Sequence, residues 1–401
     1  MIVAEQGIFG VSTQMSNQKP PARPESYDKQ IALVLEGGGA LGSYQAGVYE
    51  TLADSAYLPD WIAGTSIGAI NAAIIAGNAP KDRVAQLRKF WEEITSPTAL
   101  WPAAGLSNPW ASWQRTASAL SSALFGQPDF FTPYSFEDWI LRGPHLSYYS
   151  TSALKSTLER LVDFERINTS KEMRFSVGAV NLRTGRLVYF DNAEITIRPE
   201  HVMASGALPP AFPPIEIGDD YYWDGGLVSN TPLQYVLDYY PRRSRLTFQV
   251  DVFPGHGQIP TNLDEVYERD KDIRYSSRTR VSTDAFQQRH EVRHAINELE
   301  KLLPPEIAAT DQAKRLHAFG CVTEMDIVQL IYRPPEPQGA SKDFEFSRGT
   351  MKDRWQHGSS DASTTLCASP WLAPKPREIG VRVFDVMHDI LAGKLRAVTK
   401  D

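Results

Sequence analysis

The sequence predicts an α/β fold in which a mainly parallel central sheet lies between layers of helices. Ile31–Leu35 is an unbroken apolar run, as expected of a strand that is buried on both faces. It stops at a group of glycines, and the helically spaced side chains of Tyr44–Leu52 follow. Trp61–Ala63 repeats this order, because the second short strand ends in a turn and leads into the apolar helix Ile67–Gly77. Strands that alternate with helices in this way are typical of an α/β layered fold.

The later elements are predicted from the same two signals, a short apolar run for a strand and a spacing of three to four residues for a helix. Pro199–Ser205 has proline at its first position, which a helix tolerates. The expected strands are Met173–Val180, Arg186–Phe190, Tyr221–Trp223, Leu246–Val252 and Ile327–Tyr332. The expected helices are Lys81–Ile94, Pro199–Ser205, Thr231–Tyr239, Asn262–Leu303, Phe344–Trp355 and Pro376–Leu395.

Length and local composition predict the domain organisation. The 401 residues exceed the about 250–300 at which a single core stops growing, so we expect a main domain and an addition. Residues 1–30 are polar and proline-rich and are predicted to form a disordered tail. The main domain is expected at 31–253, and a mostly helical addition at 254–401. Residues 96–147 show no helical or strand periodicity and are rich in tryptophan and phenylalanine. We interpret them as a subdomain at the edge of the sheet in preference to a lid.

Charge and cysteine content narrow the class of protein. The net charge of −7 argues against a nucleic-acid partner, because a phosphate-binding surface must be basic. Cys321 and Cys367 indicate neither a disulfide framework nor a zinc site, and they fit a reducing cytoplasm. No apolar run approaches the about 18 residues of a membrane-spanning helix, and the first 30 residues lack the features of a signal peptide. We therefore expect a cytoplasmic protein.

Ser66 is the strongest candidate for a nucleophile. It lies at the centre of Gly64-Thr65-Ser66-Ile67-Gly68, which fits the pattern G-x-S-x-G, directly after an apolar strand and before an apolar helix. Small residues let the chain bend sharply at such a turn, so the serine oxygen is exposed above the sheet. The unpaired amides at the start of the helix face whatever the serine attacks.

A serine nucleophile needs a base, and two residues could supply it. Asp224 lies at a strand end before Gly225 and Gly226, where a carboxylate can approach another part of the backbone. An ordinary surface turn is the simpler interpretation of this Asp-Gly pair. His256 follows a predicted strand and is the candidate for an enzyme of the Ser-His-Asp type.

The glycines before the first helix have two interpretations. Gly37, Gly39 and Gly42 fit G-x-G-x-x-G, the fingerprint of a dinucleotide-binding loop. That interpretation requires an acidic residue at the end of the second strand, and Ser66 and its neighbours stand there instead. The glycine amides can alternatively stabilise the negative oxygen that forms in acyl transfer, at about 3 kcal/mol per donor.

These blocks resemble the patatin-like phospholipases. Gly37–Gly42, Gly64–Gly68 and Asp224–Gly226 reproduce the family's three blocks in order, and Ala204–Ala207 and Ser229–Pro232 are similar to its connecting motifs. The resemblance covers about residues 31 to 253. The segment after it looks like the additional domain of unknown function that some bacterial members carry.

The resemblance implies a three-layer patatin-like fold and a catalytic dyad of Ser66 and Asp224 that works without a histidine. Ser66 would attack the ester carbonyl, and Asp224 would accept its proton. The amides of Gly37, Gly38 and Gly39, chiefly the last two, would form the oxyanion hole. The glycines that would support the motifs are Gly42, Gly64, Gly68, Gly225 and Gly226. The resemblance implies no metal and no cofactor.

The expected activity is that of a serine acyl-ester hydrolase, a lipid acyl hydrolase of the phospholipase A type. Many family members carry arginine or lysine where this chain has Leu41. A cationic neighbour of the oxyanion is therefore absent, which leaves neutral esters or hydroxyacid oligomers open as alternative substrates. The dinucleotide alternative also stays open here. The expected partner is a lipid or acyl-ester substrate, and peripheral membrane contact and a homo-oligomer are left open.

Overall fold

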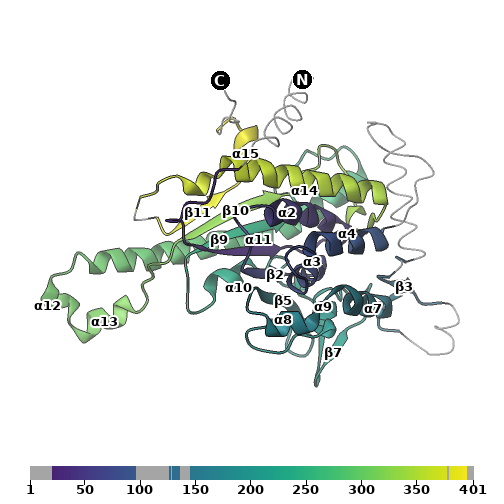
Figure 1. Ribbon diagram of the computed structural model, residues 1–401, viewed down its shortest axis with the longest axis horizontal. Coiled ribbons are helices and arrows are strands. Elements are labelled where there is room, and N and C mark those ends of the chain that lie inside the picture. Colours follow the sequence, from purple (N-terminus) through teal and green to yellow (C-terminus); the bar gives the residue numbers. More distant parts are fainter. Residues whose placement is uncertain (1–19, 96–125, 128, 136–144, 377–378, 395–401) are drawn as a thin grey trace.

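The computed structural model describes residues 20–95, 126–127, 129–135, 145–376 and 379–394 (Figure 1). Among these residues, nine strands form one sheet in the order β11-β10-β9-β1-β2-β5-β8-β7, and β6 also pairs with β5. The strands of this sheet are β1 (Gln30–Leu35), β2 (Trp61–Gly64), β5 (Arg174–Asn181), β6 (Leu187–Asp191), β7 (Ile215–Ile217), β8 (Asp220–Asp224), β9 (Arg245–Asp251), β10 (Met325–Ile331) and β11 (Val381–Phe384). A separate two-stranded pair consists of β3 (Thr132–Pro133) and β4 (Tyr149–Ser150).

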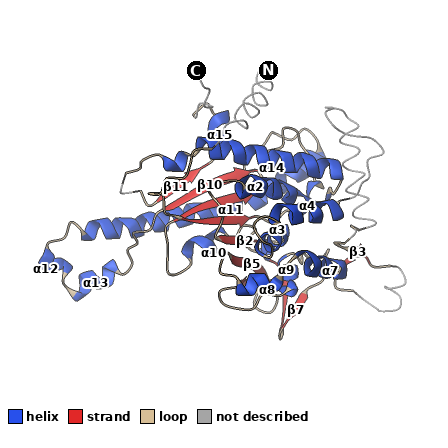
Figure 2. Cartoon of the chain, viewed as in Figure 1, coloured by secondary structure: helices blue, strands red, loops and turns tan. Residues whose placement is uncertain are grey.

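The sheet is mainly parallel, as the sequence predicts. Six neighbouring strands from β11 to β5 run in the same direction, and β6, β7 and β8 are antiparallel to their neighbours. Helices cover the sheet (Figure 2). The helices of the described residues are α2 (Gly42–Ala53), α3 (Ile67–Ala76), α4 (Arg83–Glu93), α7 (Ser152–Leu161), α8 (Phe164–Thr169), α9 (Pro199–Ser205), α10 (Leu233–Asp238), α11 (Leu263–Glu300), α12 (Pro305–Ala308), α13 (Asp311–His317), α14 (Arg348–Ala368) and α15 (Val386–Leu391).

Strand β1 shows why the fold has three layers. Successive side chains of a strand point to opposite faces, so an apolar run must be covered on both. Ile31, Leu33 and Leu35 belong to the larger core, together with α2, α3 and α14. Ala32 and Val34 belong to a smaller core that α10 and Phe286 of α11 close. The unbroken apolar run of β1 thus fills both cores.

The described C-terminal segment is mostly helical, and it also contributes two strands to the main sheet, which the sequence did not indicate for 376–395. β10 pairs with β9 in parallel along its whole length, and β11 pairs with β10. Val381–Phe384 is therefore a strand and not part of the helix expected at 376–395. On the larger core, α14 crosses α2 so closely that an added Cβ at Gly47 would lie 1.9 Å from the carbonyl oxygen of Trp355.

The tail predicted at 1–30 ends earlier than expected in the described part of the chain. The Tyr27 hydroxyl donates to Asp326 of β10 at 2.7 Å, and the Lys29 ammonium is paired with the same carboxylate at 2.6 Å. These two contacts hold the chain against the sheet before β1 begins. Residues 1–19 lie outside the described residues, as do most of the aromatic stretch at 96–147 and its predicted subdomain.

Helix α11 is the long charged helix that the sequence predicts. Its far half, with α12 and α13, extends away from the sheet (Figure 1). Among the residues that the structure describes, no helix combines the length and the apolar character needed to cross a membrane.

Candidate active site

Ser66 lies on a strained turn between β2 and α3. Its backbone has φ 56° and ψ −125°, a region that residues with side chains rarely adopt. Close backbone packing surrounds the turn, because an added Cβ at Gly64 would lie 2.2 Å from the Gly68 carbonyl oxygen. At Gly68 it would lie 2.4 Å from the carbonyl oxygen of Leu35. A side chain at either position would clash with the backbone, so both residues must be glycine. Their close packing fixes Ser66 directly after the end of β2.

A second segment holds the turn from the other side. The Ser66 amide donates to both the carbonyl oxygen and the hydroxyl oxygen of Ser205, each at 3.1 Å. The Ser205 hydroxyl in turn donates to the carbonyl oxygen of Gly178 on β5 at 2.6 Å. The motif around Ser205 thus fixes the backbone of Ser66 from α9.

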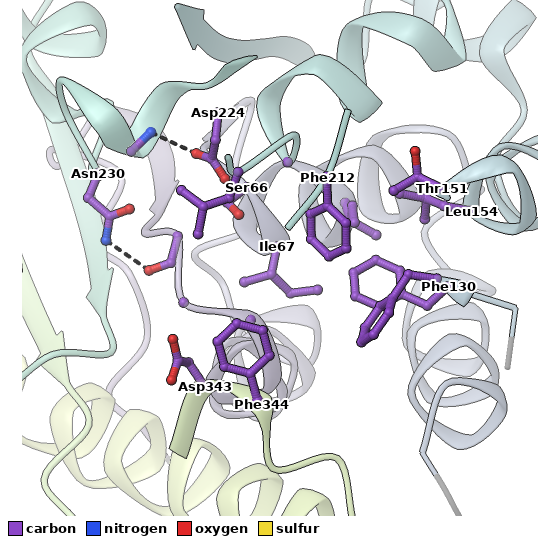
Figure 3. A pocket seen from close by; sticks show the side chains of 18 of the residues that line it. Ser66, Ile67, Phe130, Thr151, Leu154, Phe212, Asp224, Asn230, Asp343 and Phe344 are labelled. Carbon is purple, nitrogen blue, oxygen red and sulfur yellow. Dashed lines mark hydrogen bonds between the residues drawn. The ribbon is translucent and has the colours of Figure 1, made fainter. Parts of the chain in front are cut away.

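Asp224 is the last residue of β8 and is almost completely buried, at 2% exposure. Its Oδ1 accepts a hydrogen bond from the Gly226 amide at 2.7 Å. Burial raises the pKa of Asp224 to about 7, against the lowering effect of the Gly226 amide and of a hydrogen bond with the Ser66 side chain. Figure 3 shows the two side chains next to each other. Such an arrangement allows a carboxylate to take up the proton of a hydroxyl.

The glycine loop is fixed by Asn230. The Gly37 amide donates to the carbonyl oxygen of Asn230 at 3.1 Å, and the Asn230 side-chain amide donates to the carbonyl oxygen of Gly37 at 2.8 Å. The Gly37 amide is therefore already used, which corrects its predicted place among three oxyanion donors. Gly38 and Gly39 follow at the start of a short 3₁₀ turn, where the first amides have no partner within the turn.

Glu36, directly after β1, also holds the glycine loop in place through Asn230 and Val252. It is fully buried, and its carboxylate accepts from the side-chain amide of Asn230 at 2.9 Å and from the Val252 amide at 2.6 Å. Burial and the neighbouring Asp251 raise its pKa well above the ordinary value. Sequence reasoning did not single out Glu36. The available signal was a carboxylate placed between a fully apolar strand and three glycines.

Ser66 and Asp224 share one pocket of about 820 Å³, its open mouth included. One wall is apolar and is built largely by aromatic and aliphatic side chains from α3, α7, α9 and the segments around them. These wall residues are Ile67, Ile70, Phe130, Phe131, Leu154, Met203, Leu208, Phe212 and Phe346. Figure 3 shows Phe130 and Leu154 on one side of Ser66, and Asn230 and Asp343 on the other.

Most of the predicted site residues come together around this pocket. It is lined by Ser66, Asp224, Gly37, Gly38, Gly39 and Gly226. Gly42, Gly64, Gly68 and Gly225 pack behind it; an added Cβ at Gly225 would lie 2.5 Å from the carbonyl oxygen of Gly178. The sequence did not indicate that Tyr275, Asp343, Phe344 and Phe346 reach the pocket from the C-terminal segment.

His256 lies elsewhere. Its ring stacks on His388, with 5.1 Å between the ring centroids, and it lines a second cleft with Arg269 and Arg333. Among the described residues that line the Ser66 pocket there is no histidine. This placement argues against the Ser-His-Asp alternative.

One side of the glycine loop, at Gly39, is covered by the C-terminal segment, which argues against the dinucleotide alternative. Gly39 has a φ of +55°, and an added Cβ there would lie 2.3 Å from the carbonyl oxygen of Asp343. A pyrophosphate would need this position open. In the described part of the chain, no cluster of three or more His, Cys, Asp or Glu side chains is placed to hold a metal ion.

Comparison with protein families identifies the family of the chain. Residues 33–237, half of the chain, match the family described as patatin-like phospholipase. The chain belongs to the patatin-like phospholipase family. Residues 273–378 match a second family, described as patatin phospholipase, which corresponds to the additional C-terminal segment that the resemblance implies.

Several known proteins are similar to parts of the chain. An uncharacterised NTE family protein of Mycobacterium tuberculosis is 27% identical over 205 residues, which cover 51% of this chain and 27% of that protein. Patatin-like phospholipase domain-containing protein 7 of Rattus norvegicus is 38% identical over 88 residues, 20% of this chain and 6% of that protein. The matches thus span about a quarter or less of these relatives. The solved structure of human GIVD cytosolic phospholipase A2 is 10% identical, with a TM-score of 0.37, and the match covers 91% of this chain and 62% of that one.

Proposed function

We propose that the protein is a serine hydrolase of lipid or fatty-acyl esters that uses Ser66 and Asp224 as a catalytic dyad. The observation that carries the proposal is the position of the two side chains, because a hydroxyl on a strained turn lies beside a buried carboxylate at the base of a largely apolar pocket. Membership of the patatin-like phospholipase family supports the same substrate class.

In this mechanism Ser66 Oγ attacks the ester carbonyl carbon while Asp224 accepts the hydroxyl proton. The carbonyl oxygen becomes negative, and the amides of Gly38 and Gly39 are proposed to stabilise it. When the intermediate collapses, the bond to the alcohol oxygen breaks and Asp224 returns the proton to the leaving alcohol. Water then attacks the acyl-enzyme, and Asp224 takes a proton from that water and passes it to Ser66 Oγ as the acid leaves.

The electrostatics of Asp224 suit this role. An ordinary carboxyl group has a pKa near 4 and is a weak base at neutral pH. Burial raises the pKa of Asp224 to about 7. A base with a pKa near the working pH combines ionisation with the strongest tendency to take up a proton. The hydrogen bond from Gly226 fixes the orientation of the carboxylate while it does so.

The pocket also supports an acyl chain as the bound group. Its apolar wall begins at Ile67, directly after the nucleophile, and continues to Phe131 and Leu154. Burying an acyl chain there would contribute about 0.8 kcal/mol for each methylene group. A cytoplasmic location, peripheral membrane contact and self-association stay predictions from the sequence.

The test is hydrolysis of p-nitrophenyl esters of increasing chain length, together with labelling by a fluorophosphonate probe. Ser66→Ala should abolish labelling and lower kcat by at least about 1000-fold, and Asp224→Asn should lower both rates strongly. His256→Ala is the control, because its ring lies in the second cleft, and it should keep the activity of the unmodified protein.

Turnover by Ser66→Ala at the unmodified rate would overturn the proposal. Loss of activity in His256→Ala with full activity in Asp224→Asn would replace the dyad by a histidine mechanism.

A further inference from the structure

The C-terminal segment contributes a charged residue, Asp343, to the lining of the pocket. The proposed mechanism gives this residue no role. Residues 338–346, here called the strap, run from the end of β10 towards α14 and pass over the glycine loop. Asp343, Phe344 and Phe346 of the strap line the pocket with Ser66. Asp343 and Asp224 are the charged side chains among the described lining residues, which include no lysine, arginine or histidine.

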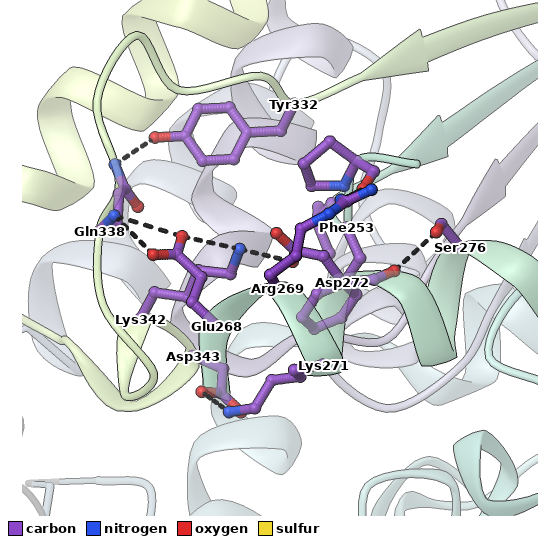
Figure 4. Close-up of polar contacts among 12 residues, drawn as sticks. Phe253, Glu268, Arg269, Lys271, Asp272, Ser276, Tyr332, Gln338, Lys342 and Asp343 are labelled. Atoms are coloured by element: carbon purple, nitrogen blue, oxygen red, sulfur yellow. Dashed lines mark hydrogen bonds and ion pairs between the residues drawn. The ribbon is translucent and has the colours of Figure 1, made fainter. Parts of the chain in front are cut away.

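The strap is held firmly on α11. Glu268 accepts hydrogen bonds from the amides of Gln338 and Gly339, and it pairs with the buried Lys342 at 3.1 Å (Figure 4). Lys342 also pairs with Asp272 at 2.6 Å and is only 1% exposed. The position of Asp343, the next residue, is therefore determined by buried ionic contacts.

On its other side the strap is held by α14. The guanidinium group of Arg354, which is fully buried, donates to the carbonyl oxygens of Lys342 and Glu345 at 2.9 and 3.2 Å. Main-chain atoms on both sides of Asp343 are thus fixed. The backbone at Asp343 therefore has little freedom to move away from the pocket.

Lys271 of α11 pairs with Asp343 in a defined orientation. Its ammonium group lies 2.7 Å from Asp343 Oδ1 and 2.7 Å from the carbonyl oxygen of Ala340 (Figure 4). Asp343 lines the pocket and Lys271 does not. Asp343 is therefore the member of the pair that lines the pocket, and the Lys271 ammonium bonded to its Oδ1 offsets part of its negative charge.

Tyr275 also lies close to the negative charges of the pocket. Tyr275 lines the pocket, and burial together with the carboxylates of Asp343 and Asp224 raises the pKa of its hydroxyl. Arg278, which donates to the carbonyl oxygen of Gly226 at 3.2 Å, acts against this effect from outside the lining, and the charged side chains among the described lining residues themselves are both carboxylates. Figure 3 shows Asp343 on the side of the pocket that lies across from the apolar wall.

We propose that Asp343 is a specificity-determining residue that disfavours esters with a negatively charged alcohol part and favours esters of neutral or cationic alcohols. This inference rests on the proposed function, because it assigns the apolar wall to the acyl chain and the side of Asp343 to the alcohol. An anionic group placed beside Asp343 would meet a carboxylate of the same sign with no cation in the described lining to offset it.

The test uses three butyrate esters that differ in the charge of the alcohol: choline, its neutral isostere 3,3-dimethylbutanol, and 2-hydroxyethanesulfonate. Hydrolysis is followed by pH-stat titration at low ionic strength. The readout is the ratio of kcat/KM between the neutral and the anionic ester, because changes that affect the shared acyl chemistry cancel in this ratio. We expect a ratio of about 10 for the unmodified protein.

Two substitutions should move this ratio in opposite directions. Asp343→Asn leaves Lys271 uncompensated and should lower the ratio about fivefold or more. Lys271→Met leaves the carboxylate uncompensated and should raise it by a similar factor. Adding 0.5 M salt, roughly the ionic strength at which charges are screened within a few ångströms, should lower the ratio of the unmodified protein.

A ratio that stays within twofold in both variants, or that shifts in the same direction in both, overturns the role of Asp343. Ser66→Ala separates this outcome from failure of the proposed function, because undiminished hydrolysis of the neutral ester by that variant would refute the dyad itself.

Discussion

Asp224→Asn should stabilise the protein at pH 8 while it removes the proposed base. The folded protein holds the Asp224 proton more tightly than the unfolded chain does, because burial raises the pKa from 3.8 to about 7. This residue therefore favours folding below a pH of about 4, and that contribution is lost as the pH rises through about 7. The difference in pKa corresponds to about 4 kcal/mol at pH 8 and to about 2 kcal/mol at pH 5.

Asparagine has nearly the shape of aspartate and no charge. Asp224→Asn should therefore recover most of the folding stability that is lost when the buried Asp224 ionises. Its side-chain oxygen can still accept the hydrogen bond from Gly226. The measurement is urea unfolding of the purified protein and the variant at pH 5 and at pH 8, followed by circular dichroism. The gain in the free energy of unfolding should be about two to three times as large at pH 8 as at pH 5.

Asp220→Asn is the matched control, because Asp220 lies at the other end of the same strand. It is partly exposed and accepts a hydrogen bond from Arg183 that lowers its pKa. Its contribution to stability is present above its unfolded pKa and is lost as the pH falls, so this variant should not be stabilised at pH 8. If Asp224→Asn is no more stable than the unmodified protein at pH 8, the buried, uncompensated charge at this site is refuted.

Three further predictions concern activity and the strap. The kcat/KM for ester hydrolysis should rise with pH and level off above about 7, as Asp224 ionises; a profile that is flat from pH 5 to 8 would contradict the raised pKa. Lys342→Met leaves Glu268 and Asp272 without their buried cation. It should lower the free energy of unfolding by about 3–5 kcal/mol in urea, and an unchanged midpoint would contradict this. Phe131→Ala opens the apolar wall. It should reduce the preference for octanoate over acetate esters about tenfold, and an unchanged preference would exclude the wall as the acyl site.

The parts of the fold that depend on neighbouring residues could be predicted from the sequence. β1, β2 and the helices after them follow from apolar runs interrupted by glycines, and their bounds agree with expectation within a few residues. The turn at Ser66 was predictable for the same reason, because the two glycines that permit it lie within two residues of the serine. Asp224 was one of two candidate bases in the sequence, and the structure places it beside Ser66.

The parts that depend on distant contacts could not be predicted. α14 continues to Ala368, beyond the predicted end at Trp355, through a stretch of small polar residues with weak helix propensity. The helix persists because small residues allow the close crossing with α2, where an added Cβ at Gly358 would lie 2.0 Å from the Tyr44 carbonyl oxygen. The entry of Asp343 into the pocket likewise depends on α11, far away in the sequence, and no local pattern indicates it.

The pairing of β10 with β9 also constrains how the protein is synthesised. Until residue 331 has emerged from the ribosome, β9 has no outer neighbour, and the backbone N–H and C=O groups along that side lack their partners in the finished sheet. An open edge of this kind is a template for pairing with another chain. The sequence analysis places the end of the main domain at Phe253. A gene truncated there is therefore expected to yield aggregated protein instead of a shorter working enzyme.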